Sequence, residues 1–222
     1  MAGLVFSKER KLEKAGQQVA PDIALDVRGQ DHPWVSRGGL KLAHALEHFA
    51  IDPKGMVGID VGASTGGFTD VLLQNGAARV YAVDVGHGQL AWKLRSDERV
   101  HVLEKTNARY LTAEDIPEPA DIVVCDASFI GLRTVLPAAL ALTKDAALLV
   151  ALIKPQFEAG REHVGKGGVV RDPAVHVAVC EDVRAWLDGM DDWSVEGIVE
   201  SPITGPEGNV EFLIVARKGD QP

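Results

Sequence analysis

Four charged residues have the types and surroundings needed for proton transfer. Asp126 and Lys154 each follow directly on an apolar run. A lysine that emerges from such a run is expected to be partly desolvated, and desolvation lowers the pKa of a lysine, so Lys154 could act as a general base. Lys41 and Glu211 could bring further charges to the same place, and Glu211 interrupts an otherwise apolar stretch. Each of these two could equally be a solvated surface charge.

A glycine-rich stretch lies between an apolar run and the start of an expected helix. Residues 59–68 read Ile-Asp-Val-Gly-Ala-Ser-Thr-Gly-Gly-Phe. In an open α/β sheet, ligands bind at the carboxyl ends of the strands, and glycines there let the backbone turn sharply and come close to a ligand. The stretch therefore predicts a cofactor site, although an ordinary turn from a strand to a helix would leave a similar pattern.

The chemistry of this stretch favours one class of cofactor. Dinucleotide sites use the pattern G-x-G-x-x-G to seat a pyrophosphate, whereas here Ser64 replaces the second glycine and Asp60 precedes the first. A carboxylate at that point repels a diphosphate but suits the cationic methionine part of S-adenosyl-L-methionine. We therefore predict an S-adenosylmethionine site rather than an NAD site. Its predicted contacts in this stretch are Asp60, Gly62, Ala63, Ser64, Gly66, Gly67 and Phe68.

Two later polar residues extend the predicted cofactor site. Asp84 ends the next apolar run, close to the ~20-residue offset from the first glycine at which an acidic side chain takes ribose hydroxyls. A carboxylate there also disfavours a cofactor that carries a 2′-phosphate. Asn107 follows the third run and could pair with the adenine edge, but an Asn in that place can equally be a turn former. No metal site is predicted.

Apolar runs and helical periodicities alternate along most of the chain. Strands are predicted at residues 57–61, 80–85, 101–104, 122–126, 147–153, 193–199 and 210–216. Helices are predicted from Ser36, which is placed to cap the first of them, and at residues 68–74, 88–94, 132–142 and 175–187. Five apolar runs separated by helices indicate a parallel sheet covered on both faces, and two final strands joined by a tight turn indicate an antiparallel pair at one edge.

This element order predicts a doubly wound α/β fold of the Rossmann-like methyltransferase type, mostly parallel with an antiparallel edge pair. Asp126 and Lys154 then end the fourth and fifth strands, so both should project into one cleft beside the cofactor, and Asp126 is a further predicted cofactor contact. Methyl transfer from a sulfonium to a hydroxyl needs little beyond alignment of the oxygen and removal of its proton. An oxygen target is favoured over a base, protein or small-molecule target, because residues 126–129 lack the prolines common in amino-directed enzymes.

Composition is that of a globular domain. Of the 222 residues, 46% are hydrophobic and 25% are charged, which argues against disordered and fibrous chains. The two cysteines stand far apart in apolar runs, so neither a disulfide framework nor a metal cluster is expected, and a reducing cytoplasm fits best. No apolar run is long enough to span a membrane, and the amino terminus lacks a signal-peptide pattern, so we expect neither stable membrane insertion nor export.

The charge of the chain is unevenly distributed. The net charge of −9 argues against indiscriminate nucleic-acid binding, because affinity for phosphates comes from Lys and Arg. Residues 1–41, however, hold seven basic and five acidic residues, while residues 42–222 hold sixteen and twenty-seven. A basic patch on an acidic body is therefore compatible with an RNA partner.

Five motifs resemble the TlyA branch of the FtsJ-like ribose methyltransferases. They are S-R-G-G-L-K-L from residue 36, residues 60–68, residues 84–94, I-K-P-Q-F-E-A-G-R from residue 153 and G-P-E-G-N from residue 205. The resemblance covers nearly all of residues 31–217. It implies S-adenosylmethionine as the cofactor and ribosomal RNA or ribosomal subunits, not DNA, as the partner. It also implies ribose 2′-hydroxyls, of cytidine in particular, as the target, and many members carry a haemolysin label.

The resemblance further implies residue roles and a domain organisation. The family's Lys-Asp-Lys-Glu tetrad falls on Lys41, Asp126, Lys154 and Glu211, with Lys154 as the base. Residues 36–217 would form the methyltransferase domain and residues 218–222 a tail. Residues 1–30, with short strands expected at 3–6 and 23–27, resemble only the carboxyl-terminal portion of the family's small RNA-binding domain, followed by a linker to about residue 35. The oligomeric state does not follow from the sequence.

The segment 154–172 carries four glycines together with Arg161, Lys166 and Arg171. A loop of this length inside a compact domain is usually functional or disordered. We predict that it closes over cofactor and RNA, with its basic side chains on phosphates, and a merely flexible loop is the alternative. Two other functions stay open at this point. One is an RNA-binding or haemolysin-like protein that keeps the fold with little activity, and the other is a pore-forming toxin, against which the lack of a spanning segment counts.

Overall fold

The computed structural model describes residues 5–7, 10–12, 18–20, 23–27, 32–205 and 207–219. The chain divides into two compact units, residues 1–33 and residues 34–222. In the first unit, β1 (Val5–Ser7) pairs antiparallel with β2 (Arg10–Lys11) and with β3 (Asp26–Val27). The strands predicted at 3–6 and 23–27 are thus each found in part, while residues 3 and 4 lie outside the described residues.

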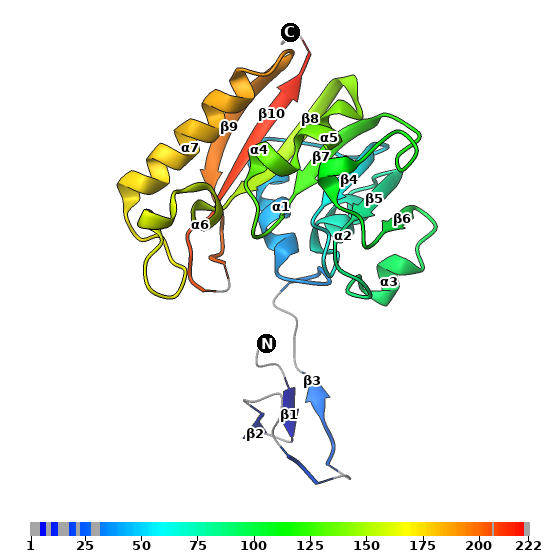
Figure 1. Ribbon diagram of the computed structural model, residues 1–222. Helices are drawn as coiled ribbons and strands as arrows, with labels where there is room; N and C mark the ends of the chain where they lie inside the picture. The colour runs from blue at the N-terminus through cyan, green and yellow to red at the C-terminus, as the bar shows by residue number, and fades with distance from the viewer. Residues whose placement is uncertain are drawn as a thin grey trace. The chain divides into compact units, whose positions relative to one another are not determined.

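Seven strands form the sheet of the second unit (Figure 1). They are β4 (Val57–Val61), β5 (Arg79–Val83), β6 (Val100–Leu103), β7 (Ala120–Cys125), β8 (Thr143–Ile153), β9 (Trp193–Glu200) and β10 (Phe212–Lys218). Their spatial order is β6-β5-β4-β7-β8-β10-β9. The first five run parallel, whereas β10 is antiparallel to both β8 and β9. The predicted mostly parallel sheet with an antiparallel pair at one edge is confirmed.

Helices cover both faces of this sheet (Figure 1). One face buries apolar side chains of α1 (Gly38–His48), α2 (Gly67–Gln74) and α3 (Trp92–Arg95). The other buries those of α4 (Leu132–Val135), α5 (Pro137–Ala141) and α7 (Pro173–Asp188). Three single-turn elements complete the unit, namely α6 (Pro155–Glu158) and the 3-10 turns η1 (Ala108–Tyr110) and η2 (Arg161–His163). Within the described residues, none of the helices combines the length and apolarity that a membrane crossing requires.

Two predicted helices differ from the structure in how they begin or continue. Ser36 does not cap the first helix, because the residue that precedes α1 is Arg37 and the helix has no side-chain cap. The helix predicted at 132–142 is divided into α4 and α5 at Pro137. The proline has no backbone N–H to donate to the preceding turn, so the first helix ends there and a new one begins with the proline in its first position.

The segment after β5 is less helical than its periodicity predicts. Of the helix predicted at 88–94, only the single turn of α3 forms. Gly88 has a φ of +69°, which a helix does not admit, and the chain reaches Ala91 in an extended conformation before α3 begins. The helix predicted at 175–187 is confirmed as α7.

The connection between the last two strands is longer than the predicted tight turn. β9 ends at Glu200 and β10 begins at Phe212, so residues 201–211 lie between them. Glu211 therefore precedes β10 instead of lying within it. Its backbone still touches the neighbouring strand's end, because the amide of Ser201 donates to the Glu211 carbonyl at 2.8 Å.

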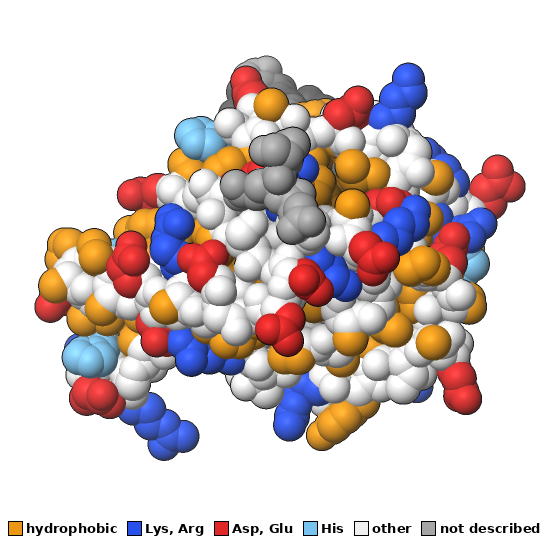
Figure 2. Space-filling model, turned by 90° about the horizontal axis from the view of Figure 1, so that it is seen from above, with side chains coloured by type: hydrophobic (Ala, Val, Ile, Leu, Met, Phe, Trp, Pro, Cys, Tyr) orange, Lys and Arg blue, Asp and Glu red, His pale blue; other side chains and the backbone are white. Residues whose placement is uncertain are grey.

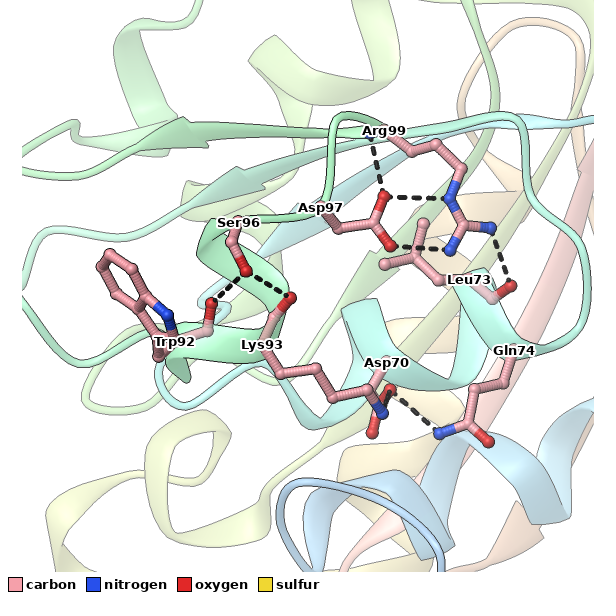
Figure 3. Close-up of polar contacts among 8 residues, drawn as sticks. All are labelled: Asp70, Leu73, Gln74, Trp92, Lys93, Ser96, Asp97 and Arg99. Atoms are coloured by element: carbon pink, nitrogen blue, oxygen red, sulfur yellow. Dashed lines mark hydrogen bonds and ion pairs between the residues drawn. The ribbon is translucent and has the colours of Figure 1, made fainter.

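A buried carboxylate in α2 fastens the segment before α1 to the sheet. Asp70 is 1% exposed, and its Oδ2 accepts a hydrogen bond from the backbone N–H of Val35 at 2.9 Å. Figure 3 shows Lys93 and Gln74 reaching the same carboxylate, with Nζ and Nε2 at 3.0 and 2.9 Å from Oδ1. Movement of residues 34–36 is therefore linked to α2, the helix that follows the glycine-rich stretch.

Replacing Asp70 by alanine should lower the free energy of unfolding by about 2–3 kcal/mol, because the partly buried backbone N–H of Val35 loses its acceptor. Urea denaturation followed by circular dichroism measures the loss. The matched control is Gln74→Ala, which removes one hydrogen bond at an exposed position and should cost less than about 0.5 kcal/mol. Equal losses in the two variants would show that the link to Val35 contributes nothing.

Candidate active site

A cavity of about 740 Å³ lies at the carboxyl ends of β4, β7 and β8. Its walls come from the start of α1, the segments that follow those three strands, and the connection between β9 and β10. This is the end of the sheet where this fold class binds its ligands. Figure 2 shows the opposite end, where β10 finishes, and there Lys and Arg side chains lie among Asp and Glu side chains.

Four charged side chains from four separate parts of the chain meet in this cavity. Lys41 Nζ lies 2.6 Å from Glu211 Oε2 and 3.6 Å from Asp126 Oδ2. Lys154 Nζ lies 2.6 Å from Asp126 Oδ1. The side chains of the two lysines are 8% and 7% exposed, that of Glu211 is 1% exposed, and that of Asp126 is 21% exposed. The four form a chain of alternating charge, with Asp126 between the two lysines.

The fold explains why these four residues meet. Asp126 and Lys154 follow β7 and β8, which are parallel neighbours, so both side chains leave the sheet at the same end. Because β10 is antiparallel, the residue just before it, Glu211, arrives at that end too. Lys41 comes from the first turns of α1. The sequence predicted that Asp126 and Lys154 share a cleft, and the structure places all four together.

Lys154 has a contact that the sequence reasoning missed. Its Nζ donates to Ser128 Oγ at 2.9 Å and to the Asp126 backbone carbonyl at 3.1 Å. Its Nζ also pairs with the Asp126 carboxylate at 2.6 Å, and these contacts together fix the direction of the side chain. Ser128 stands two residues after a predicted strand-end carboxylate, and that position was the available signal.

Asp60, near the end of β4, is a buried carboxylate with one free oxygen. Its Oδ2 accepts from the Thr69 backbone N–H at 2.9 Å and from Thr69 Oγ1 at 2.7 Å. Its Oδ1 is buried without a hydrogen-bond partner among the described residues. Burial raises the pKa of Asp60 to about 7, against the lowering effect of the two Thr69 hydrogen bonds. The residue lines the cavity, so the free oxygen is suited to a cationic group of a ligand.

Glycines bring the backbone after β4 close to its neighbours. Gly62 has a φ of +82°, and a Cβ there would lie 2.9 Å from Cα of Ala127. Gly66 has a φ of +95° and precedes α2, where a Cβ would collide with Leu94. Of the predicted contacts in this stretch, all but Gly66 line the cavity, and these are Asp60, Gly62, Ala63, Ser64, Gly67 and Phe68.

Asp84 and Asn107, which are also predicted cofactor contacts, lie in different surroundings. Asp84 borders a small hollow that shares Ala63 and Ser64 with the main cavity, and its carboxylate accepts from the backbone N–H groups of Ser64 (2.8 Å) and Gly86 (2.6 Å). Asn107 is not among the lining residues of either hollow. Its side chain accepts from the Arg109 N–H at the start of η1, which is the role of a turn former.

The segment after α6 forms one wall of the cavity. We call residues 159–172 the glycine-rich loop. It folds back on itself at the bridge between Gly165 and Val169, and Val164, Gly167 and Gly168 line the cavity. Its basic residues, Arg161, Lys166 and Arg171, are exposed. The structure thus places the loop beside the charge cluster, where the closing role predicted for it stays a proposal.

An exposed aromatic side chain stands at the rim of the cavity. Phe129 is 90% exposed, lines the cavity and has a φ of +66°, a conformation that a phenylalanine rarely adopts. Its ring lies 5.1 Å from that of Phe157, another lining residue. Because an exposed ring in a strained conformation gains nothing from burial, this pair points to a flat, apolar ligand surface. Sequence reasoning did not single out either ring.

Comparisons with known proteins agree with this geometry. The family model described as FtsJ-like methyltransferase matches residues 34–218. A Mycobacterium tuberculosis relative, the 16S/23S rRNA (cytidine-2′-O)-methyltransferase TlyA, is 51% identical over 92% of this chain and 76% of the relative. Hemolysin A of Brachyspira hyodysenteriae is 38% identical over 96% of this chain and 88% of the relative. A hemolysin-labelled Streptococcus thermophilus structure superposes with a TM-score of 0.85 at 46% identity, covering 100% of this chain and 81% of that one.

Proposed function

Because this chain belongs to the FtsJ-like methyltransferase family, we propose that it transfers a methyl group from S-adenosylmethionine to a ribose 2′-hydroxyl of ribosomal RNA. The observation that carries the proposal is the buried, alternating cluster of Lys41, Asp126, Lys154 and Glu211 at the wall of the cavity. The 51% identical relative named for cytidine-2′-O-methylation supports cytidine as the target nucleotide.

The residues around the cavity fit S-adenosylmethionine. The free, buried Oδ1 of Asp60 is an acceptor for the ammonium of the methionine part. The positive φ of Gly62 and the lack of a side chain there let a ligand approach the backbone. Asp84, in the adjoining hollow, is placed for the ribose hydroxyls once its contacts with the Ser64 and Gly86 amides are exchanged. When bound, the cofactor supplies an electrophilic methyl group on a sulfonium.

The charge cluster moves the proton that the reaction releases. Lys154 must first lose one ammonium proton to solvent, after which the neutral Nζ accepts the proton of the ribose 2′-hydroxyl and so frees that oxygen for methylation. Asp126 and Ser128 hold the amine in place, at 2.6 and 2.9 Å. Lys41 and Glu211, 2.6 Å apart and buried, position Asp126 from the other side and compensate each other's charge.

The rim of the cavity suits a nucleotide that has left its helix. A ribose hydroxyl can reach Lys154 only when the nucleotide enters the cavity, so its base needs a surface on which to stack. Phe129, exposed and next to Ser128, offers such a surface. We assign phosphate contacts to Arg161, Lys166 and Arg171, which are exposed on the glycine-rich loop, and further RNA contacts to the first unit, residues 1–33.

The proposal is tested by incubating the chain with S-adenosylmethionine labelled in its methyl group, together with ribosomal subunits or naked ribosomal RNA. Nuclease digestion and mass spectrometry then locate the label. We expect it on the 2′-oxygen of a cytidine. Label on a base nitrogen or carbon, or on protein, would overturn the ribose target. A chain that binds the cofactor without transferring label to any of these RNAs would overturn the choice of substrate.

Cofactor binding should weaken as the pH falls. The free Asp60 carboxyl has a pKa near 7, so below that pH it is increasingly protonated and loses the charge that attracts an ammonium. The affinity measured by calorimetry should fall about tenfold from pH 7 to about pH 5.5. Asp60→Asn, which keeps the shape and stays neutral, should bind weakly with little change over the same range. A wild-type affinity that does not vary with pH would contradict the proposed contact.

A further inference from the structure

Asn209 joins two segments that are far apart in the sequence. Its Oδ1 accepts from the Val170 backbone N–H at 3.0 Å, and its Nδ2 donates to the Gly168 carbonyl at 2.9 Å. Both partners belong to the glycine-rich loop. Asn209 itself is 3% exposed, so its amide is occupied at both ends by the loop backbone. An amide is suited to this task because it offers one acceptor and one donor side by side.

Among the described residues, the loop's other polar contacts with the rest of the domain lie at its two ends and at Val170. At the ends, Ala159 bonds to α6 and Asp172 to α7. The His176 ring nitrogen Nε2 contacts the Val170 carbonyl at 2.9 Å, and the Gly165–Val169 bridge lies within the loop itself. Val169 and Val170 are buried, whereas Gly165 to Gly168 are exposed. The exposed turn that carries Lys166 and lines the cavity is therefore held at one end by the Asn209 side chain.

Asn209 and Glu211 lie in the same short segment, the connection between β9 and β10. The Gly205 backbone N–H donates to the Asn209 carbonyl at 2.9 Å, which closes a turn two residues ahead of Glu211. A Cβ on Gly205 would lie 2.6 Å from Glu211 Oε1, so this turn packs directly against the carboxylate. Glu211 in turn pairs with Lys41 at 2.6 Å. A change at Asn209 thus reaches the loop on one side and the buried ion pair on the other.

We propose that Asn209 is a positioning residue that couples RNA contact by the glycine-rich loop to the placement of the Lys41–Glu211 pair. The RNA part of this inference rests on the proposed function. The connection between the glycine-rich loop and Asn209 does not, because it rests on the hydrogen bonds alone. With the loop seated on RNA, the Val170 and Gly168 contacts hold Asn209, and Asn209 holds the turn that packs on Glu211. The loop is then more than a cover, because its position is transmitted to the charge cluster.

Limited trypsin digestion tests the connection without any activity. Cleavage after Lys166, followed by mass spectrometry, should be at least about tenfold faster in Asn209→Ala, because protease access follows local opening. Asn209→Asp keeps the acceptor for Val170 but loses the donor to Gly168, and it should be cleaved at an intermediate rate. Asn75→Ala, which loses a hydrogen bond at the end of α2, is the matched control and should be cleaved like the wild type. Wild-type cleavage of Asn209→Ala would overturn the proposal.

Kinetics test the coupling to the cluster. In Asn209→Ala, kcat should fall on the order of tenfold, the KM for RNA should rise, and the KM for S-adenosylmethionine should stay within about twofold. Lys166→Ala should raise the KM for RNA in the wild type, but not in the Asn209→Ala background, because the loop is already uncoupled there. An unchanged kcat, a matching loss of cofactor binding, or additive effects of the two substitutions would each overturn the proposal.

The two levels of failure can be told apart. If the wild type transfers no methyl group to RNA, the proposed function fails, while the digestion experiment still decides whether Asn209 holds the loop. If the wild type is active and Asn209→Ala differs from it in neither digestion nor kcat, only the positioning role fails. Thermal unfolding of each variant, with cofactor present, confirms that the compared proteins are folded.

Discussion

Replacement of Lys154 by alanine should lower kcat for methyl transfer by about 10²–10⁴-fold, the range expected for loss of a general base. The side chain is 7% exposed and is held in place by Asp126 and Ser128, so a water molecule cannot readily take its place. Single-turnover transfer of labelled methyl to ribosomal RNA measures the loss. Cofactor binding should change little, because it depends on Asp60 and the glycine-rich stretch of residues 59–68.

Lys154→Arg separates a base from a fixed positive charge. Arginine stays protonated in proteins, so it can pair with Asp126 but cannot accept the hydroxyl proton. We expect it to be as inactive as Lys154→Ala. The matched control is Lys144→Ala in β8, which breaks a surface ion pair with Asp121 of β7 and should leave kcat unchanged. An arginine variant with wild-type kcat would contradict the role of Lys154 as the base.

Glu211→Gln should have two effects, a less stable fold and a slower reaction. The substitution keeps the shape of the side chain but removes the charge that faces Lys41 at 2.6 Å, and it leaves a buried ammonium beside Asp126 alone, at 3.6 Å. Breaking one partner of a buried pair costs about 3–5 kcal/mol of unfolding free energy. Displacement of Asp126 towards Lys41 should also lower kcat by about 100-fold, since a shift of ~1 Å in a reacting group can cost that much.

The two effects can be separated with a second variant. Lys41→Met combined with Glu211→Leu replaces the ion pair by apolar side chains of similar size, which often restores or even raises stability. We expect unfolding in urea to return close to the wild-type midpoint while kcat stays low. Recovery of kcat together with stability would mean that the pair serves the fold alone and has no part in positioning Asp126.

Strand positions were predictable because each strand core is a short apolar run between polar turns. Residues 57–61 match β4 at both ends, and the runs behind β7 and β8 predicted that Asp126 and Lys154 leave the sheet together. This works because a parallel strand buried on both faces is almost continuously apolar, and Asp60 is the one charged residue inside β4. The main features of the fold and the neighbourhood of the two residues therefore follow from local composition.

Other parts depend on contacts between distant segments and could not be predicted locally. Residues 201–211 are shaped by Asn209 bonding to the glycine-rich loop and by Glu211 pairing with Lys41, and neither partner is near in sequence. The tight turn predicted there was wrong for that reason. Phe129 has a φ of +66°, which no residue pattern indicates, so its exposure at the cavity rim was not foreseen.

The position of β10 has a consequence for folding during synthesis of the chain. Among the described strands β10 is the last to be synthesised, yet it lies between β8 and β9, which precede it in the chain. A nascent chain that has emerged only as far as β9 lacks β10, the strand that joins β8 to β9 in the sheet, and it also lacks Glu211. Lys41 then lacks the carboxylate that lies 2.6 Å from it in the complete fold. The RNA methyltransferase proposed above would thus stay incomplete on the ribosome until β10 has emerged and inserted between β8 and β9.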